Sequence, residues 1–123
     1  MDIRILTPAE LDEAIRLAKE VILSEIDVSW SKEAAKSISE FMAERLKQFT
    51  VYGLYEEGLE SILAYDPEKM HIILLLTKQA SRKKRYATAL LNHLKEEADK
   101  NRLSKITANV VDSAADFYHH YGF

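Results

Sequence analysis

Five consecutive aliphatic residues, Ile72 to Leu76, form the segment that most constrains the fold of this 123-residue chain. The run lacks the alternation of apolar and polar residues that marks a strand with one solvent-exposed face. It therefore predicts a central strand over Met70–Leu76 that is buried on both faces. An amphipathic helix pattern follows at Tyr86–Ala98, with its apolar residues on one face. A buried strand followed closely by such a helix predicts a sheet with helices packed on it.

The rest of the chain predicts further strands and helices around this centre. We expect strands at 3–6, 50–55, 60–65 and 106–111. Helices are expected at 11–22, from Ser31 onward and at 114–121. Thr7, Pro8 and Glu10 form a capping box ahead of the first helix. The order is β-α-α-β-β-β-α-β-α, an α/β (α+β) arrangement in one domain covering 1–123. The second helix is expected to bury Ala34, Ile38, Phe41, Met42 and Leu46.

A basic turn separates the central strand from the helix that follows it. The chain holds 20 acidic residues and has a net charge of −3, yet the stretch from His71 to Lys95 contains none of them. A helix N-terminus presents unpaired N–H groups and partial positive charge, so cations beside it suit a diphosphate. A solvated basic face and a nucleic-acid patch are the alternatives. The net negative charge and the lack of a second basic stripe in the sequence disfavour nucleic acid. The basic residues of the stretch are Lys78, Arg82, Lys83, Lys84, Arg85 and Lys95.

Composition narrows the possible chemistry. Cysteine is absent, which excludes disulfides, zinc–thiolate sites and a cysteine nucleophile. No apolar run reaches the roughly 20 residues that span a bilayer, and the start of the chain has no signal-peptide pattern, so we expect a cytoplasmic protein without membrane contact. The histidines show no metal-ligand spacing, so we expect no metal. His71 could take a proton from an amine, although a surface histidine at a strand end is the more common role.

Two passages resemble the GNAT superfamily of N-acetyltransferases. Members show an apolar strand, a turn of the form [Q/R]-x-x-G-x-[G/A] and then a helix; Arg82 to Ala87 fits this frame inside the passage His71–Leu94. Residues 106–109 and the sequence FYHHYGF at 117–123 resemble the family's fifth strand and FY-x-x-x-GF helix. The element order agrees as well, so the resemblance covers essentially the whole chain. It implies a mixed, mostly antiparallel sheet flanked by helices.

The resemblance also implies a function and a set of site residues. Acetyl-CoA would be the acetyl donor, and an amine of a small molecule or peptide would attack it directly. Tyr118 would protonate the departing thiolate. The residues that would pair with pantetheine through their backbone are Leu75, Leu76 and Thr77, and those that would face it with side chains are Asn109 and Ser113. The pyrophosphate would be held by Arg82, Lys83, Lys84, Arg85, Tyr86 and Ala87.

The sequence departs from the family pattern at two points. Arg85 stands where members usually have glycine, because the backbone there approaches phosphate closely. An outward-pointing Arg85 side chain would still allow cofactor binding. Members also continue past Gly-Phe with a hairpin that covers the fifth strand, whereas this sequence ends at Phe123. A naturally short member, a truncated product and completion by a partner chain all explain this, and we expect a homodimer that covers the exposed edge. The alternative function is a catalytically impaired GNAT-like remnant that acts as a CoA-binding or dimerisation module.

Overall fold

The computed structural model describes residues 1–25, 31–82, 84–100 and 105–108 of the chain. Its five strands form one sheet in the order β1-β2-β3-β4-β5. The pairs β1–β2, β2–β3 and β3–β4 are antiparallel, whereas β4 and β5 are parallel, which confirms the mixed, mostly antiparallel sheet. The strands are β1 (Asp2–Ile5), β2 (Thr50–Tyr55), β3 (Leu59–Asp66), β4 (His71–Thr77) and β5 (Thr107–Ala108).

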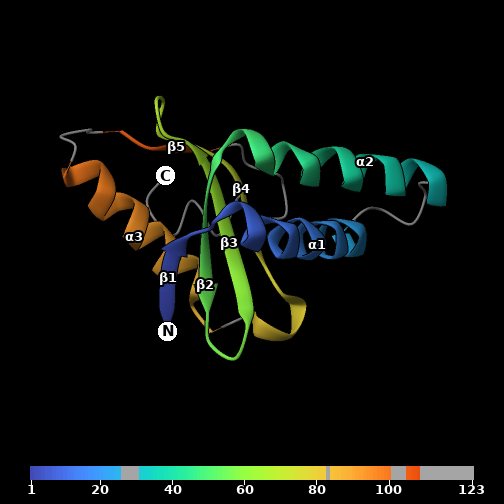
Figure 1. Ribbon diagram of the computed structural model, residues 1–123, viewed down its shortest axis with the longest axis horizontal. Coiled ribbons are helices and arrows are strands. Elements are labelled where there is room, and N and C mark those ends of the chain that lie inside the picture. The colour runs from blue at the N-terminus through green and yellow to red at the C-terminus, as the bar shows by residue number, and fades with distance from the viewer. Residues whose placement is uncertain (26–30, 83, 101–104, 109–123) are drawn as a thin grey trace.

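Helices cover both faces of the sheet (Figure 1). α1 (Pro8–Glu25) and α2 (Lys32–Glu44) lie together on one side, and α3 (Tyr86–Lys100) lies on the other. Two short 3₁₀ turns, η1 (Arg45–Gln48) and η2 (Gln79–Ser81), follow α2 and β4. The described elements follow the predicted order, while the helix expected at 114–121 lies outside the described residues.

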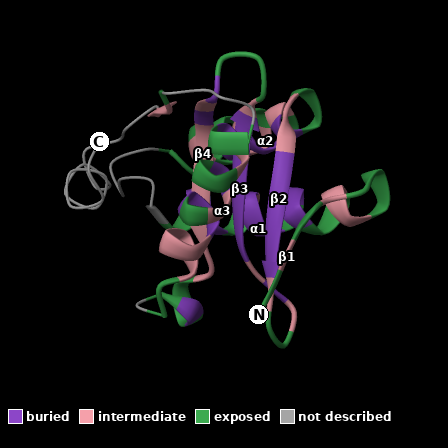
Figure 2. Ribbon diagram, turned by 90° about the vertical axis from the view of Figure 1, so that its left-hand side faces the viewer, coloured by how far each residue is buried: buried purple, intermediate pink, exposed green. Residues whose placement is uncertain are grey.

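The sheet separates two hydrophobic clusters, and β2 and β3 between them are almost wholly buried (Figure 2). The α3 side includes an aromatic group: the rings of Tyr52 and Tyr65 stack with centroids 5.5 Å apart, and His93 meets Tyr52 edge-on at 4.8 Å. The helix expected at 11–22 and the apolar face expected for the helix at Tyr86–Ala98 are both confirmed. The buried residues of α1 are Ala14, Ile15, Leu17, Ala18, Val21 and Ile22, and those of α3 are Leu90, Leu91, Leu94 and Ala98.

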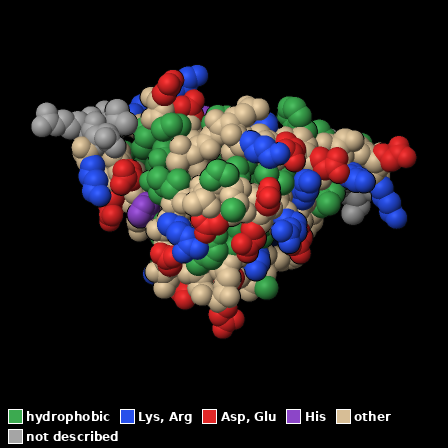
Figure 3. Space-filling model, viewed as in Figure 1, with side chains coloured by type: hydrophobic (Ala, Val, Ile, Leu, Met, Phe, Trp, Pro, Cys, Tyr) green, Lys and Arg blue, Asp and Glu red, His purple; other side chains and the backbone are tan. Residues whose placement is uncertain are grey.

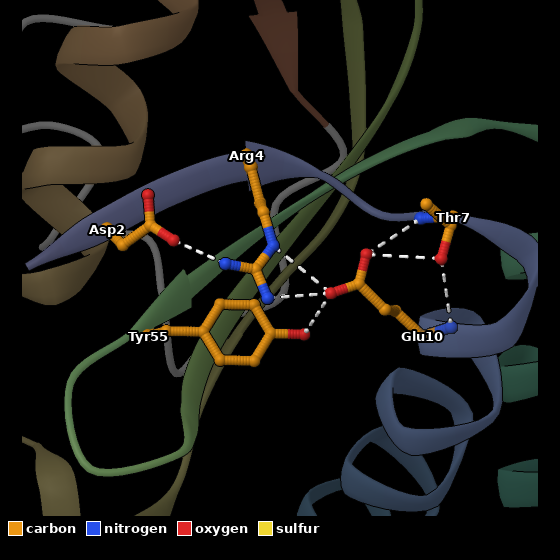
Figure 4. A network of polar contacts seen from close by, with 5 residues as sticks. All are labelled: Asp2, Arg4, Thr7, Glu10 and Tyr55. Atoms are coloured by element: carbon orange, nitrogen blue, oxygen red, sulfur yellow. Dashed lines mark hydrogen bonds and ion pairs between the residues drawn. The ribbon is translucent and has the colours of Figure 1, made fainter.

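The start of α1 is fixed by the predicted capping box (Figure 4). The N–H of Glu10 donates to Thr7 Oγ1 over 3.3 Å, and the Thr7 N–H donates back to Glu10 Oε1 over 3.2 Å. The other carboxylate oxygen of Glu10 accepts two hydrogen bonds from the Arg4 guanidinium, at 3.1 and 2.7 Å. That guanidinium lies 4.1 Å from the ring centroid of Tyr55 on β2. One carboxylate thus links α1 to β1 and β2.

The prediction for the buried face of α2 is right in part. Leu46 is fully buried and Met42 packs against the cluster on the α1 side. Ala34 is exposed, Ile38 is 36% exposed and Phe41 is 66% exposed, while Ser39 and Ala43 are buried instead. Small side chains allow α2 to pack closely on α1. The buried hydroxyl of Ser39 donates a hydrogen bond to the carbonyl of Lys36 over 2.9 Å. Burying this polar side chain therefore costs little free energy of folding.

β4 is also less enclosed than its composition predicts. Ile72 is fully buried, but each residue from Ile73 to Thr77 keeps part of its surface exposed. Both sheet faces are covered at this point, because Leu76 packs against the α1 cluster and Leu75 against the α3 cluster. The remaining exposure is therefore a property of one edge of the strand, which is where the candidate site begins.

Candidate cofactor-binding site

The carboxyl end of β4 consists of Leu75, Leu76 and Thr77, which pair with β3 on one side. The two leucine side chains are used in packing on opposite faces of the sheet. The Thr77 hydroxyl lies 2.8 Å from the hydroxyl of Ser61 on β3, which itself donates to the carbonyl of Leu76 over 2.8 Å. These contacts hold the end of β4 firmly against β3 and leave its backbone as the part that can meet a ligand.

A bulge changes the direction of β4 side chains halfway along the strand. The register against β3 skips Ile73. Because of this extra residue, Leu74 and Leu76 contact the α1 cluster, whereas Ile72 and Leu75 contact the α3 cluster. The bulge thus reverses which face of the sheet each later residue of β4 would occupy by simple alternation, and it bends the strand at this position.

Within the described residues, the side of β4 that faces away from β3 pairs with β5 at its start, where His71 aligns with Thr107 and Ile72 with Ala108. From Ile73 to Thr77, no strand in the described part of the chain pairs with this side, which we call the outer edge of β4. Five residues of strand are about 16 Å long at about 3.3 Å per residue. Such an edge offers backbone N–H and C=O groups to an extended ligand that carries amides.

The basic turn begins directly after the outer edge and is anchored to β3. The N–H of Lys78 donates to the carbonyl of Glu60 over 2.9 Å. The buried hydroxyl of Ser81 donates to the carboxylate of the same residue. Arg82 and Lys84 follow and are exposed. Glu60 therefore fixes the inner side of the turn, while the cations lie on its outer side.

Arg85 adopts a left-handed backbone conformation with φ 62°, a region that favours glycine. Its carbonyl accepts the hydrogen bond of Ala89 over 3.0 Å, so it occupies the residue position immediately before α3. Its side chain is exposed, as an outward-pointing arginine requires. Tyr86 and Ala87 form the first turn of α3, where backbone N–H groups lack helical partners. At position 85 the backbone has the conformation that glycine usually adopts, and the arginine side chain adds positive charge.

His71 marks the other end of the outer edge. Its Nδ1 lies 2.6 Å from Thr107 Oγ1 on β5, and the imidazole is half-buried rather than on the open surface. The residue before it, Met70, has φ 49° and a buried side chain. The carbonyl of Met70 accepts from the Thr107 N–H over 3.2 Å. A strained residue and two hydrogen bonds thus define the point where β5 joins β4.

The structure brings together only part of the predicted site. The end of β4 and the basic turn are adjacent along one side of the sheet, as expected. The predicted residues Lys83, Asn109, Ser113 and Tyr118 lie outside the described residues.

The sequence did not reveal the two residues of β3 that support the end of β4 and the basic turn. Ser61 is fully buried beneath the end of β4, and Glu60 holds the basic turn. A serine directly before the apolar run Ile62–Ala64 was a usable signal, because a buried hydroxyl needs a specific partner. The role of Thr107 carried no such signal, since threonine is common in strands.

Neither a metal site nor a membrane-spanning helix is found among the described residues. They contain no group of three or more histidine and acidic residues that could hold a metal ion. None of their helices is long and apolar enough to cross a bilayer. On the face seen in Figure 3, basic and acidic side chains are interspersed over α1 and α2, so that face presents no extended basic surface for nucleic acid.

The sequence matches the family described as acetyltransferase (GNAT) domain over residues 12–123. The chain belongs to the GNAT acetyltransferase family. This GNAT domain gives no significant match in a search of curated proteins. Its family membership therefore rests on the domain match and agrees with the fold.

Solved structures share the fold of this GNAT domain. A GCN5-related N-acetyltransferase from Rhodopseudomonas palustris has a TM-score of 0.78 at 16% identity, covering 98% of this chain and 79% of its own. PaiA N-acetyltransferase from Thermoplasma acidophilum, solved with coenzyme A, has a TM-score of 0.77 at 18% identity, covering 100% and 90%. A predicted acetyltransferase from Clostridium acetobutylicum, solved with acetyl-CoA, has a TM-score of 0.69 at 18% identity, covering 99% and 88%. At these identities the likeness establishes the fold alone.

A cavity of about 470 Å³ opens beside the basic turn of this GNAT domain, on the α1 side of the sheet. Lys78 and Glu20 place one cation and one carboxylate in its wall. The cavity adjoins the end of β4 opposite to His71. Its full lining is Leu17, Glu20, Val21, Ser24, Lys78, Gln79 and Ala80.

Proposed function

We propose that the chain is an acetyl-CoA-dependent N-acetyltransferase that moves an acetyl group to an amine of a small molecule or peptide by direct attack. One observation carries this proposal: the outer edge of β4 leads directly into an exposed basic turn, and the left-handed Arg85 joins that turn to the first turn of α3. This arrangement places an anion site next to a strand edge that can form hydrogen bonds. The anion site suits the diphosphate of CoA, and the strand edge suits the pantetheine arm with its amides.

The residues have separate parts in cofactor binding. The two amides of pantetheine pair with backbone groups of Leu75, Leu76 and Thr77 along the outer edge, much as a further strand would. The pyrophosphate lies against the N–H groups of Tyr86 and Ala87, where the helix dipole favours negative charge. The surrounding cations add attraction that salt screens. These cations are Arg82, Lys83, Lys84 and Arg85.

The remaining site residues complete the proposal through the family resemblance. Asn109 and Ser113 face the pantetheine arm. Tyr118 gives its phenolic proton to the departing thiolate, a role for which a phenol is chemically suited. In this reaction the acetyl donor is a cosubstrate, and the proposal includes no metal ion.

Two measurements on the purified chain test the proposal. Saturating acetyl-CoA should raise the melting temperature, since ligand at 100 times its dissociation constant adds about 2.7 kcal/mol to stability. A panel of putrescine, phenethylamine, L-lysine and an alanine-terminated peptide should then give acetyl-CoA-dependent release of free thiol. The absence of any thermal shift at millimolar acetyl-CoA would reject the proposal.

A charge-reversal pair locates the cofactor. Lys83→Glu combined with Lys84→Glu should weaken acetyl-CoA binding, because it places two carboxylates beside the diphosphate. Lys32→Glu with Lys36→Glu makes the same change at exposed positions on α2 and serves as the matched control. Equal loss of affinity in both double variants would point to a general effect of net charge.

The alternative function, a catalytically impaired remnant, gives a different result. It predicts that CoA raises the melting temperature while no amine of the panel is acetylated, or that neither effect occurs. The homodimer expected over the β5 edge stays a prediction. Light scattering at high protein concentration measures it, and a stable monomer would contradict it.

A further inference from the structure

We propose that the cavity between α1 and the turn after β4 binds a small α-amino acid with an aliphatic side chain. This ligand site lies beside the proposed cofactor site and is distinct from it, because none of the seven residues that line the cavity is assigned to acetyl-CoA. Binding at the cavity does not depend on acetyl transfer, so the two proposals can fail separately.

One wall of the cavity is a single face of α1. The α1 residues that line it recur at the i, i+3, i+4 and i+7 spacing, which places their side chains on the same side of the helix. The opposite wall is the segment Lys78–Ala80, at the start of η2. The volume of about 470 Å³ falls within the range of small-molecule sites, about 300–1,000 Å³. The four α1 residues are Leu17, Glu20, Val21 and Ser24.

Each wall carries one charged group that lacks an ion-pair partner. The Glu20 carboxylate and the Lys78 ammonium form no ion pair with each other or with any other residue in 1–25, 31–82, 84–100 and 105–108. Lys78 is also half-buried, whereas Arg82 and Lys84, further along the turn, are exposed. A ligand with a single charge is attracted by one of the two groups and repelled by the other. A zwitterion pairs with both.

The hydroxyl of Ser24 adapts the α1 wall to an ammonium group. Its proton is donated to the carbonyl of Val21 over 2.7 Å, so toward a ligand the oxygen acts as an acceptor. Ser24 lies one helical turn after Glu20 on the same face, and an ammonium has three N–H donors with which to reach both. On the other wall, the Lys78 ammonium has donors only, which suits the carboxylate of the ligand.

The rest of the lining favours an aliphatic side chain. Leu17 and Val21 are buried members of the cluster on the α1 side, so the floor of the cavity is continuous with the hydrophobic core. Ala80 adds a small apolar side chain from the turn. An aliphatic ligand that contacts these residues removes apolar surface from water, which favours binding.

The charge of Glu20 distinguishes this ligand from the acceptor amine. A carboxylate next to an ammonium favours its protonated form, whereas an amine must lose that proton before it can attack a thioester. The amino acid held at Glu20 is therefore bound beside the reaction and is not acetylated.

Three probes of similar shape test the pairing of charges by titration calorimetry. L-Leucine carries both charges, 3-methylbutylamine lacks its carboxylate and 4-methylpentanoate lacks its ammonium. The purified chain should bind L-leucine saturably and about fivefold or more tightly than either analogue, since each analogue loses one charged contact. Three probes that bind equally well, or no saturable binding of L-leucine at millimolar concentration, would overturn the inference.

Variants that remove one charge identify the partners. Lys78→Gln should weaken L-leucine binding by about tenfold without weakening that of 3-methylbutylamine. Glu20→Gln, at an exposed position, should weaken L-leucine binding by about fivefold without weakening that of 4-methylpentanoate. Lys95→Gln on α3 and Glu13→Gln on α1 make the same changes at exposed positions outside the cavity and are the matched controls. Equal losses in the variants and their controls would contradict the site.

A substitution that occupies the cavity tests its location. Ala80→Phe introduces a large ring at an exposed position of the lining, so it should prevent L-leucine binding while the melting temperature stays close to that of the wild type. A folded Ala80→Phe variant that binds L-leucine as the wild type does would place the ligand elsewhere and overturn the inference.

Acetyl-CoA distinguishes the amino-acid site from the proposed function. A thermal shift with acetyl-CoA but no binding of L-leucine would reject the amino-acid site and leave the acetyltransferase proposal standing, and the reverse result would do the opposite. Mass spectrometry of the chain with acetyl-CoA and L-leucine should detect no N-acetyl-leucine. Its formation, lost in Glu20→Gln, would assign the cavity to the acceptor and overturn a separate site.

Discussion

The hydroxyl of Ser61 donates a hydrogen bond to the backbone carbonyl of Leu76 over 2.8 Å, at a position where Ser61 is fully buried. Because this proton is committed to Leu76, the Thr77 hydroxyl is the donor in its own 2.8 Å contact with Ser61. A short chain of hydroxyls therefore ties β3 to the end of β4 that we propose binds the cofactor.

Loss of the Ser61 hydroxyl should weaken the fold as well as the site. Ser61→Ala leaves the Thr77 hydroxyl without its acceptor and should lower the free energy of unfolding by about 1–3 kcal/mol. Thr77→Val removes only the outer member of the chain and should cost about 1 kcal/mol. Urea unfolding measures both, and a Ser61→Ala variant as stable as the wild type would contradict the hydrogen-bond chain.

The left-handed backbone of Arg85 gives a prediction with a built-in control. Arg85→Gly should be more stable than Arg85→Ala by about 1 kcal/mol, because only glycine adopts positive φ without steric cost. Both variants lose the same charge, so the difference between them reports the backbone alone. Thermal and urea unfolding test the stability. Equal stability of the two variants would mean that the loop does not hold this conformation in solution.

The Glu10 carboxylate predicts how stability depends on pH. Hydrogen bonds from the Arg4 guanidinium and from the Thr7 backbone N–H lower its pKa from 4.5 to about 2. A lowered pKa means that the ionised form is favoured in the folded state, so its contribution is present above pH 4.5 and is lost as the pH falls from about 4.5 toward about 2.

Glu10→Gln checks this window directly. The stability gap between wild type and Glu10→Gln, measured by urea unfolding, should be larger at pH 7 than at pH 3.5. Glu96→Gln, an exposed change on α3, is the control and should leave the pH dependence as in the wild type. A gap that stays constant between the two pH values would show that the ionised Glu10 is not the source.

The observed face of α2 can be tested with two substitutions. Phe41 is 66% exposed, so Phe41→Ala should change the free energy of unfolding by no more than about 0.5 kcal/mol. Ala43 is fully buried against α1, so Ala43→Leu should cost about 1–3 kcal/mol through overpacking. The opposite ranking would support the face predicted from the sequence.

Tyr118 offers the kinetic test of the acid step. Tyr118→Phe removes the phenolic proton and keeps the ring, so kcat should fall by about 10²-fold while the dissociation constant for acetyl-CoA stays close to that of the wild type. Thiol release and calorimetry measure the two quantities. A loss of cofactor affinity with kcat unchanged would assign Tyr118 to binding instead.

The sequence predicts those features that depend on local pattern. The capping box at Thr7 and Glu10, the strand at Thr50–Tyr55 and the start of α3 at Tyr86 all agree with the structure, because each has a short-range physical cause. The α2 face was predicted only in part, because the apolar pattern of a helix does not show which of its sides fits best against a neighbouring helix. Ser39 could not be recognised as buried until its bond to Lys36 was visible.

The candidate site likewise contains some features with a local sequence pattern and others that depend on tertiary contacts. The basic turn is visible in the sequence as charge, but the left-handed φ of Arg85 and the anchoring of Ser81 on Glu60 are not, since they depend on how β3 and the turn meet. The pairing of His71 with Thr107 joins residues 36 positions apart. No local pattern encodes a contact of that range.

The extra residue at Ile73 has a consequence for how this segment tolerates change. Ile72 and Leu74 already lie on opposite faces of the sheet, so deleting Ile73 would leave Leu74 to Thr77 on their present faces and would convert the bulge into regular pairing with β3. Losing a residue between Leu74 and Thr77 would instead move the side chains that follow it to the opposite face and turn Thr77 away from Ser61. In the second half of β4, the number of residues is therefore under stricter physical control than their identity.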